Sequence, residues 1–136
     1  MTDLVCGKFQ LTESKNFEEF MQALGVGYLT RKLGNKSFPV VTVSKDGDLF
    51  HFKNESLVKT TESSFKLNEQ FDELTADGRQ VKSTMTLLKP NTLKHDMIGT
   101  QGGKDSSCVR EFFKDKMTCV CQVDDVVTER IYTRKE

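Results

Sequence analysis

The sequence predicts a mainly β protein in which about ten short antiparallel strands close into a barrel, with two short helices near the N-terminus. Two observations predict the barrel. From residue 38 onward, short runs rich in Val, Thr, Phe, Leu and Ile follow one another. Turn dipeptides separate these runs, as in a series of hairpins: Asp46-Gly47, Asp77-Gly78 and Gly102-Gly103. Because so many short strands must hide their edges, closure into a barrel is one of the few arrangements open to them.

The helices are expected between residues 16 and 35. Asn16 is a candidate N-cap, and the apolar residues that follow recur at helical spacing: Phe17, Phe20, Met21 and Leu24. Gly25 ends this first helix, and a second is expected over Tyr28–Leu33, with Gly34-Asn35 as its stop. A DNA-binding helix-turn-helix is disfavoured, since the second helix is not a basic recognition helix.

Ten strands are expected in the remaining chain. Their predicted ranges are Cys6–Glu13, Pro39–Ser44, Leu49–Asn54, Leu57–Leu67, a short segment near Phe71, Arg79–Leu88, Thr92–Met97, Ser106–Phe113, Met117–Val123 and Val126–Thr133.

The last of these strands raises a question that its pattern leaves open. Arg130 and Tyr132 are two residues apart, so a strand directs both to one face. Neither face of this strand is cleanly apolar, and periodicity does not say which face points inward. Mixed faces are typical of a barrel around a partly wet cavity, but a solid barrel with poor patterning remains an alternative.

Length and charge exclude several classes of protein. A chain of 136 residues fits a single domain, 1–136. Twenty basic residues balance twenty acidic ones, so no overall field favours nucleic acid as a partner. The N-terminal run MTDLVCGKFQ lacks the features of a secretion signal, and no window is apolar enough to span a membrane. We expect a cytoplasmic protein.

The four cysteines are expected to be reduced, as is usual in the cytosol. They form no CxxC pair and have no nearby histidines, so their spacing predicts no zinc site. Cys119 and Cys121 share one face if their segment is a strand. Packing of these thiols in an apolar interior is favoured over redox chemistry. We therefore expect neither a metal nor a cofactor.

Several segments resemble the intracellular fatty-acid-binding proteins, and in particular the heart and adipocyte subgroup of these cytosolic lipid-binding proteins. The similar runs, in order, are GKFQLTESKNFEEFMQAL, LGVGYLTRKLGN, the strand that starts at Pro39, FKLNEQFDELTADGRQVKS and TERIY. The resemblance covers almost the whole chain and is interrupted mainly at Lys89–Asp105. It implies a ten-stranded, antiparallel, up-and-down β-barrel with a helix-turn-helix lid over its mouth.

The resemblance also implies a ligand site. In the family, an arginine and an Arg-x-Tyr pair point into the cavity and hold a ligand carboxylate, which corresponds here to Arg110, Arg130 and Tyr132. The cavity and portal positions that it implies are Phe17, Met21, Pro39, Val58, Ala76, Asp77 and Cys121, to which parity along the strand adds Cys119.

A reversible carrier of a long-chain fatty acid is the function that follows from the resemblance. Retinoic acid, or another hydrophobic carboxylate, is an alternative ligand. An enzyme is disfavoured, because His95-Asp96 and the cysteine pair lack a recognisable nucleophile and base arrangement.

A membrane-surface protein is a further alternative, suggested by three basic residues of the expected lid, Arg31, Lys32 and Lys36. For the carrier, the same residues predict transient contact of the lid with anionic membranes. We expect a monomer in the cytoplasm and also in the nucleus.

Overall fold

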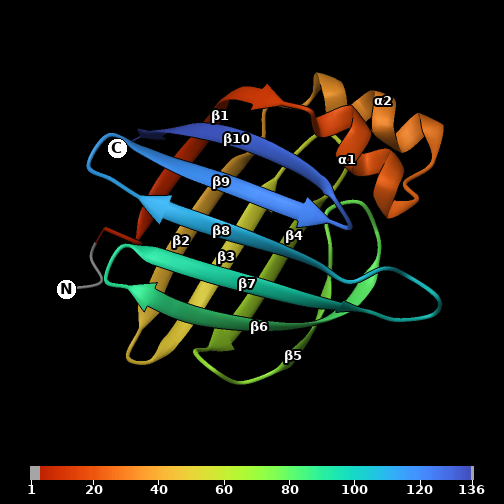
Figure 1. Ribbon diagram of the computed structural model, residues 1–136. Coiled ribbons are helices and arrows are strands. Elements are labelled where there is room, and N and C mark those ends of the chain that lie inside the picture. The colour runs from red at the N-terminus through yellow and green to blue at the C-terminus, as the bar shows by residue number, and fades with distance from the viewer. Residues whose placement is uncertain (1–3, 136) are drawn as a thin grey trace.

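The computed structural model describes residues 4–135 and contains ten strands and two helices (Figure 1). The helices are α1 (Phe17–Leu24) and α2 (Tyr28–Lys36). The strands are β1 (Gly7–Lys15), β2 (Val40–Asp46), β3 (Leu49–Glu55), β4 (Thr60–Lys66), β5 (Phe71–Leu74), β6 (Gln80–Lys89), β7 (Thr92–Gly99), β8 (Ser106–Phe112), β9 (Lys116–Val123) and β10 (Val126–Lys135).

The strands form one antiparallel sheet in which nearly every strand pairs with its neighbour in the chain. The order is β4-β3-β2-β1-β10-β9-β8-β7-β6-β5, so the first and last strands of the chain lie side by side. In that pairing Leu11 of β1 lies opposite Tyr132 of β10, and a bulge follows before Glu13. The predicted mainly β, up-and-down barrel is confirmed.

The barrel is nearly closed rather than fully closed by hydrogen bonds. Strands β4 and β5 stand at the two ends of the sheet, and no strand pairing joins them in the described part of the chain. Side chains fill the seam instead. The rings of Phe65 and Phe71 stack with centroids 5.2 Å apart, and the backbone N–H of Asn68 donates to the carbonyl of Met85. At this seam the barrel is therefore closed by side-chain packing and not by strand pairing.

The two helices lie together over one end of the barrel, at the upper right of Figure 1. Helix α1 begins after Asn16 as predicted, but Asn16 adopts a left-handed conformation and makes no side-chain cap. Its side-chain amide instead donates to the carbonyl of Val127 at 2.9 Å. Phe20 and Met21 are the buried residues of α1. Within residues 4–135, neither helix is long and apolar enough to cross a bilayer.

Helix α2 extends to Lys36, beyond the predicted stop at Gly34. Gly34 has a packing role instead, because a Cβ atom there would lie 3.0 Å from the sulfur of Met21 in α1. A side chain at residue 34 would crowd the end of the Met21 side chain, so the glycine leaves room for the packing of α1 against α2.

Aromatic side chains make up much of the solid part of the core. Phe9 of β1 and Phe112 of β8 are fully buried, and their rings meet edge to face with centroids 5.5 Å apart. These strands lie on different parts of the barrel wall, so the contact joins them across the interior. Neither ring lines the internal cavity described below.

We predict that Phe112→Ala lowers the free energy of unfolding by about 3 to 5 kcal/mol, because it leaves a cavity beside Phe9. Chemical denaturation monitored by circular dichroism measures the change. Val120→Ala is the control, since Val120 is 40% exposed and its truncation should cost less than about 1 kcal/mol. Equal losses in the two variants would contradict this account of the core.

Candidate ligand-binding site

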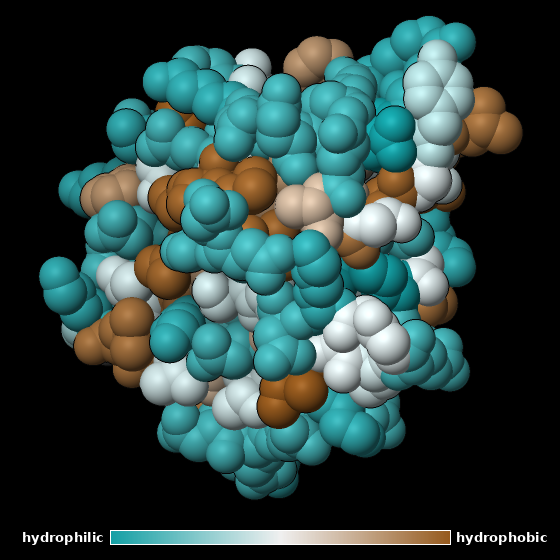
Figure 2. All heavy atoms as spheres, turned by 45° about the vertical axis from the view of Figure 1, so that its right-hand side comes forward, coloured by the Kyte–Doolittle hydropathy of each residue, from teal (hydrophilic) through white to brown (hydrophobic). Residues whose placement is uncertain are grey.

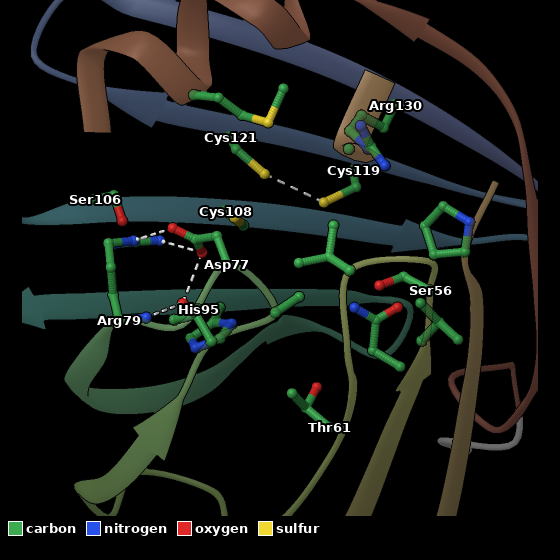
Figure 3. Close-up of a pocket in the computed structure, with 18 of the residues that line it drawn as sticks. Ser56, Thr61, Asp77, Arg79, His95, Ser106, Cys108, Cys119, Cys121 and Arg130 are labelled. Atoms are coloured by element: carbon green, nitrogen blue, oxygen red, sulfur yellow. Dashed lines mark hydrogen bonds and ion pairs between the residues drawn. The ribbon is translucent and has the colours of Figure 1, made fainter. Parts of the chain in front are cut away.

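The barrel and its helices enclose a cavity of about 230 Å³ (Figure 3). Every residue that the sequence analysis assigned to the ligand site or portal lines this cavity: Phe17, Met21, Pro39, Val58, Ala76, Asp77, Arg110, Cys119, Cys121, Arg130 and Tyr132. Both helices contribute to the wall, so they form its roof. The barrel is therefore built around a cavity, and the alternative of a solid barrel is wrong.

The strand register explains why both arginines reach this cavity. Cys119 of β9 lies opposite Arg110 of β8 and also opposite Arg130 of β10. Residues directly opposite one another on adjacent strands share a face of the sheet. Tyr132 follows Arg130 by two residues and points to the same side. The open question of direction is thus answered: this face of β10 points inward.

Arg130 is only 7% exposed and lies against the lid. Its guanidinium carbon is 3.6 Å from the centroid of the Phe17 ring in α1. A cation over an aromatic face at this distance contributes about 2 kcal/mol when water is excluded. One guanidinium nitrogen also donates to the hydroxyl of Ser14 at 3.3 Å. The first residue of the lid therefore holds one of the two cavity cations.

Arg110 is held by a polar network that the sequence analysis missed. Its Nη1 donates to Nδ1 of His95 at 3.3 Å. Because arginine can only donate, Nδ1 accepts and the imidazole carries its proton on Nε2, which donates to Glu73 at 2.9 Å. The hydroxyl of Ser83 donates to the same carboxylate oxygen at 2.6 Å. The network thus links Arg110 to a carboxylate through the imidazole of His95.

This network sets the ionisation of Glu73. Burial raises the pKa of Glu73, but hydrogen bonds from His95 and Ser83 and the positive charge of Arg110 outweigh burial, so the pKa lies below its ordinary value of 4.5. The only sequence signal for the network was the position of His95, which shares a strand face with buried Leu93 and Met97. Nothing in the sequence placed Glu73 beside it.

The two cavity arginines have no carboxylate close enough to neutralise them. Among residues 4–135, neither Arg110 nor Arg130 has a carboxylate oxygen within 4.0 Å. Tyr132 adds a donor, because burial, opposed in part by Arg130, raises the pKa of its phenol and keeps the hydroxyl protonated at neutral pH. The cavity therefore presents two cations and a hydroxyl to whatever it encloses.

Asp77 lines the cavity wall, but its carboxylate is already hydrogen-bonded to residues of its own turn. Its carboxylate accepts from Nε of Arg79 at 2.6 Å and from the hydroxyl of Thr75 at 2.6 Å (Figure 3). The hydroxyl oxygen of Thr75 also accepts a hydrogen bond from the backbone N–H of Arg79. These contacts tie the β5–β6 connection together at the edge of the cavity. These contacts give Asp77 a structural role in the turn.

Cys119 and Cys121 are arranged as the sequence predicts, and the structure adds a third cysteine to them. Cys119 and Cys121 do share a buried face, but Cys108 of β8, opposite Cys121, joins them. The sulfur atoms of Cys119 and Cys121 are 3.4 Å apart. Hydrogen bonds from the other two thiols and the charges of Arg110 and Arg130 hold the pKa of Cys119 well below its ordinary range. Parity along β8 was the signal for Cys108, two residues before Arg110.

An antiparallel barrel that is roofed by a helix pair and encloses a cavity belongs to the lipocalin-like, or calycin, class of ligand-binding proteins. Residues 6–135 match the sequence profile of the lipocalin / cytosolic fatty-acid binding protein family. The chain belongs to this family, and the resemblance found in its sequence is confirmed. The matched family is one of binding proteins, and the relatives below are fatty acid-binding carriers and not enzymes, which contradicts the enzyme alternative.

Individual relatives are similar over almost the whole chain. The muscle fatty acid-binding protein of Schistocerca gregaria is 42% identical over 126 residues, 92% of each chain. Human fatty acid-binding protein 9 is 38% identical and spans 98% of this chain and 99% of its own. A Schistosoma mansoni fatty acid binding protein, solved in complex with arachidonic acid, superimposes with a TM-score of 0.94 at 36% identity, over 99% of this chain and 98% of its own.

We predict that Glu73→Gln reduces the dependence of stability on acid pH. Because the folded-state pKa of Glu73 lies below 4.5, its ionised form stabilises the fold at higher pH, and this contribution disappears as pH falls through the folded pKa. The variant lacks that contribution at every pH. Its free energy of unfolding should therefore fall less steeply than that of the wild type below about pH 4.5.

Urea denaturation at a series of pH values measures this difference. Glu111→Gln, a change at an exposed carboxylate of β8, should leave the wild-type pH profile in place. Parallel profiles for wild type and Glu73→Gln would show that the Glu73 network does not contribute to acid stability.

Proposed function

We propose that this protein is an intracellular carrier that reversibly binds one long-chain fatty acid in its cavity. The carboxylate would be held by Arg110, Arg130 and Tyr132. The observation that carries this proposal is the pair of inward-facing arginines with no carboxylate within 4.0 Å among residues 4–135. The names of the relatives, and arachidonic acid in the Schistosoma protein, support the choice of ligand.

Electrostatics explain why a carboxylate suits this position. Strands about 4.8 Å apart separate residues two strands away by about 10 Å along the sheet. At an effective dielectric constant of about 20, two like charges at that separation repel by roughly 1 to 2 kcal/mol. A carboxylate between the guanidiniums replaces this repulsion with charge-assisted hydrogen bonds. An alcohol or an aldehyde lacks the charge to do so.

The apolar tail would lie along the wall that leads to the lid. Phe17 and Met21 of α1, Pro39, Val58 and Ala76 supply its contacts. The cavity of about 230 Å³ is smaller than the usual range of about 300 to 1,000 Å³ for drug-sized ligands, so it has room for one ligand and not several. Retinoic acid, which offers the same carboxylate on a bulkier tail, is the second candidate ligand, and direct competition with oleate ranks the two.

Transient contact with anionic membranes through the lid is part of the proposal. Lys32 and Lys36 of α2 are exposed, and so are Leu29 and Leu33 on the same helix. Figure 2 shows a mostly hydrophilic surface from which apolar and neutral side chains project at the upper right, at the level of the helices. Such a mixture of basic and apolar side chains suits the interface of a bilayer.

Arg31 contributes less to this surface than the sequence predicts. Its Nε is 2.8 Å from a carboxylate oxygen of Glu18 in α1, and it also donates to the carbonyl of Val26. Arg31 therefore joins the two helices, and Lys32 and Lys36 are the basic residues we assign to membrane contact. A monomer in the cytoplasm, with access to the nucleus, completes the proposal.

We predict that Arg130→Ala and Arg110→Ala each weaken oleate binding by about 2 to 5 kcal/mol, the usual cost of removing one member of a buried charge pair. Isothermal titration of the delipidated protein with oleate measures the loss. Binding of oleyl alcohol should change much less, because its headgroup carries no charge.

Lys82→Ala is the matched control for these arginines. Lys82 is a strand cation that makes only a surface ion pair with Asp72 and does not line the cavity. Its loss should leave oleate affinity in place. The anchor assignment is wrong if either arginine variant binds oleate with wild-type affinity, or if oleate and oleyl alcohol lose affinity equally.

We predict that Lys32→Ala combined with Lys36→Ala slows fatty-acid transfer to anionic vesicles at low salt and leaves equilibrium affinity for oleate almost unchanged. Each lysine near an anionic surface is worth about 1 kcal/mol of attraction. Stopped-flow transfer of a fluorescent fatty acid to phosphatidylserine vesicles measures the rate.

The control changes Lys8 and Lys135, a cross-strand pair at the end of β1 farther from the lid. These substitutions remove the same charge and should not alter the transfer rate. If the lid variant transfers ligand at the wild-type rate, exchange proceeds through free solution and the lid is not a docking surface.

A further inference from the structure

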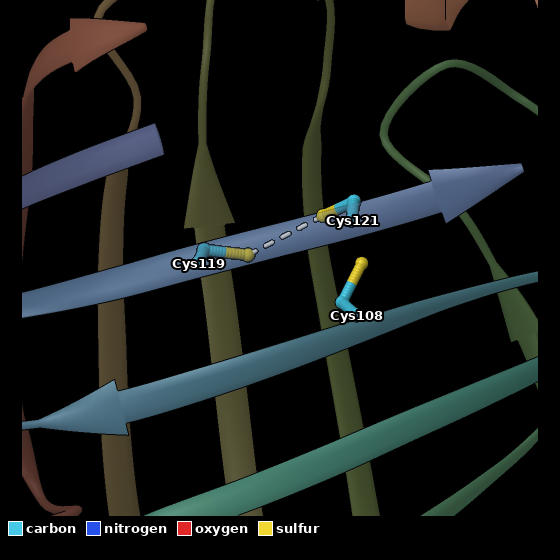
Figure 4. A group of neighbouring side chains, drawn as sticks. All are labelled: Cys108, Cys119 and Cys121. Carbon is cyan, nitrogen blue, oxygen red and sulfur yellow. Dashed lines mark hydrogen bonds between the residues drawn. The ribbon is translucent and has the colours of Figure 1, made fainter. Parts of the chain in front are cut away.

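The three cavity cysteines form a compact group of sulfur donors. The Sγ atoms of Cys108, Cys119 and Cys121 all lie within 4.8 Å of one another, and all three residues are at most 7% exposed. They come from two adjacent strands whose register fixes them on one face (Figure 4). This arrangement does not depend on a flexible loop.

The number and kind of donors favour a soft ion that accepts three ligands. Within residues 4–135, no histidine or carboxylate joins the sulfur group as a fourth ligand. Structural zinc takes four ligands in a tetrahedron, whereas Cu(I) is another soft ion that thiolates bind. Metal–sulfur bonds of about 2.3 Å in a trigonal plane put the sulfurs about 4.0 Å apart. Small side-chain rotations bring the observed group to that geometry.

Charge balance points to the same ion. Three thiolates and one Cu(I) carry a net charge of −2, and a buried charge of that size needs compensation. Arg110 and Arg130 lie opposite Cys119 on its two neighbouring strands and supply +2. A divalent ion on the same thiolates would leave one positive charge uncompensated.

We propose that Cys108, Cys119 and Cys121 form a Cu(I)-binding site inside the barrel. On binding, each thiol that carries a proton releases it to solvent, and three Cu–S bonds form. No electron is transferred, because copper arrives in the cuprous state. The ion reaches the thiols through the same cavity that extends to the lid. The spacing of the cysteines in the sequence did not predict this site, since Cys108 is eleven residues from Cys119.

The site does not depend on the proposed fatty-acid function, although the two would interact. A copper–thiolate group and a carboxylate would both use the charges of Arg110 and Arg130. Bound fatty acid should therefore weaken copper binding. For this reason the test uses the delipidated full-length protein.

Anaerobic titration against the Cu(I)–bicinchoninate complex tests the proposal. The wild type should withdraw one copper per chain and develop thiolate-to-copper charge-transfer absorption in the ultraviolet. Cys108→Ser, Cys119→Ser and Cys121→Ser should each weaken binding by about 100-fold or more, since loss of even an outer-shell partner costs about 10- to 100-fold. Cys6→Ser, the matched control, lies outside the cluster and should bind as the wild type does.

Three results would overturn the site. These are failure of the wild type to compete with bicinchoninate, wild-type affinity in any of the three cluster variants, or binding of Zn(II) as tight as that of Cu(I). X-ray absorption of the copper-loaded wild type gives a readout that needs no variant to fold. It should show three sulfur neighbours and no nitrogen, and any other first shell contradicts the assignment.

Discussion

The burial of two guanidinium groups inside the barrel is the constraint on which the arrangement of the cavity depends. A buried cation is costly unless its charge and its donors find partners. Arg130 meets this need through the Phe17 ring and Ser14, and Arg110 through Phe52 and His95. None of these partners is an anion. The cavity thus keeps a positive potential that an anionic ligand can satisfy, and this potential connects the fatty-acid proposal with the copper proposal.

The two arginines are supported by different parts of the structure. Arg130 rests on the first residue of the lid, so displacement of α1 would remove its aromatic contact. Arg110 rests on the barrel wall through His95 and Glu73, which do not move with the lid. A lid that opens would therefore loosen one anchor and leave the other in place. This asymmetry suits a carrier, which must release its ligand as well as hold it.

Closure of the barrel is also uneven. Nine strand pairings are hydrogen-bonded, whereas the β4–β5 seam depends on the stacked rings of Phe65 and Phe71. Stacked rings exclude water and contribute about 0.5 to 1.5 kcal/mol beyond their burial, but they do not bind the strands in a fixed register. The seam can therefore adjust with less cost than the paired strands. The lid and the seam are the two places where the wall of the cavity is not a continuous sheet.

The sequence by itself determined the strand and helix order, since turn dipeptides and apolar periodicity are local signals, and its family-like runs singled out Arg110, Arg130 and Tyr132. It was wrong about the role of Gly34, whose environment depends on a residue of another helix. Only the tertiary structure decided that Glu73 and His95 support Arg110, and that Cys108 joins Cys119 and Cys121. The physical reason is register: which side chains meet across strands depends on pairings between distant segments, and no local pattern encodes them.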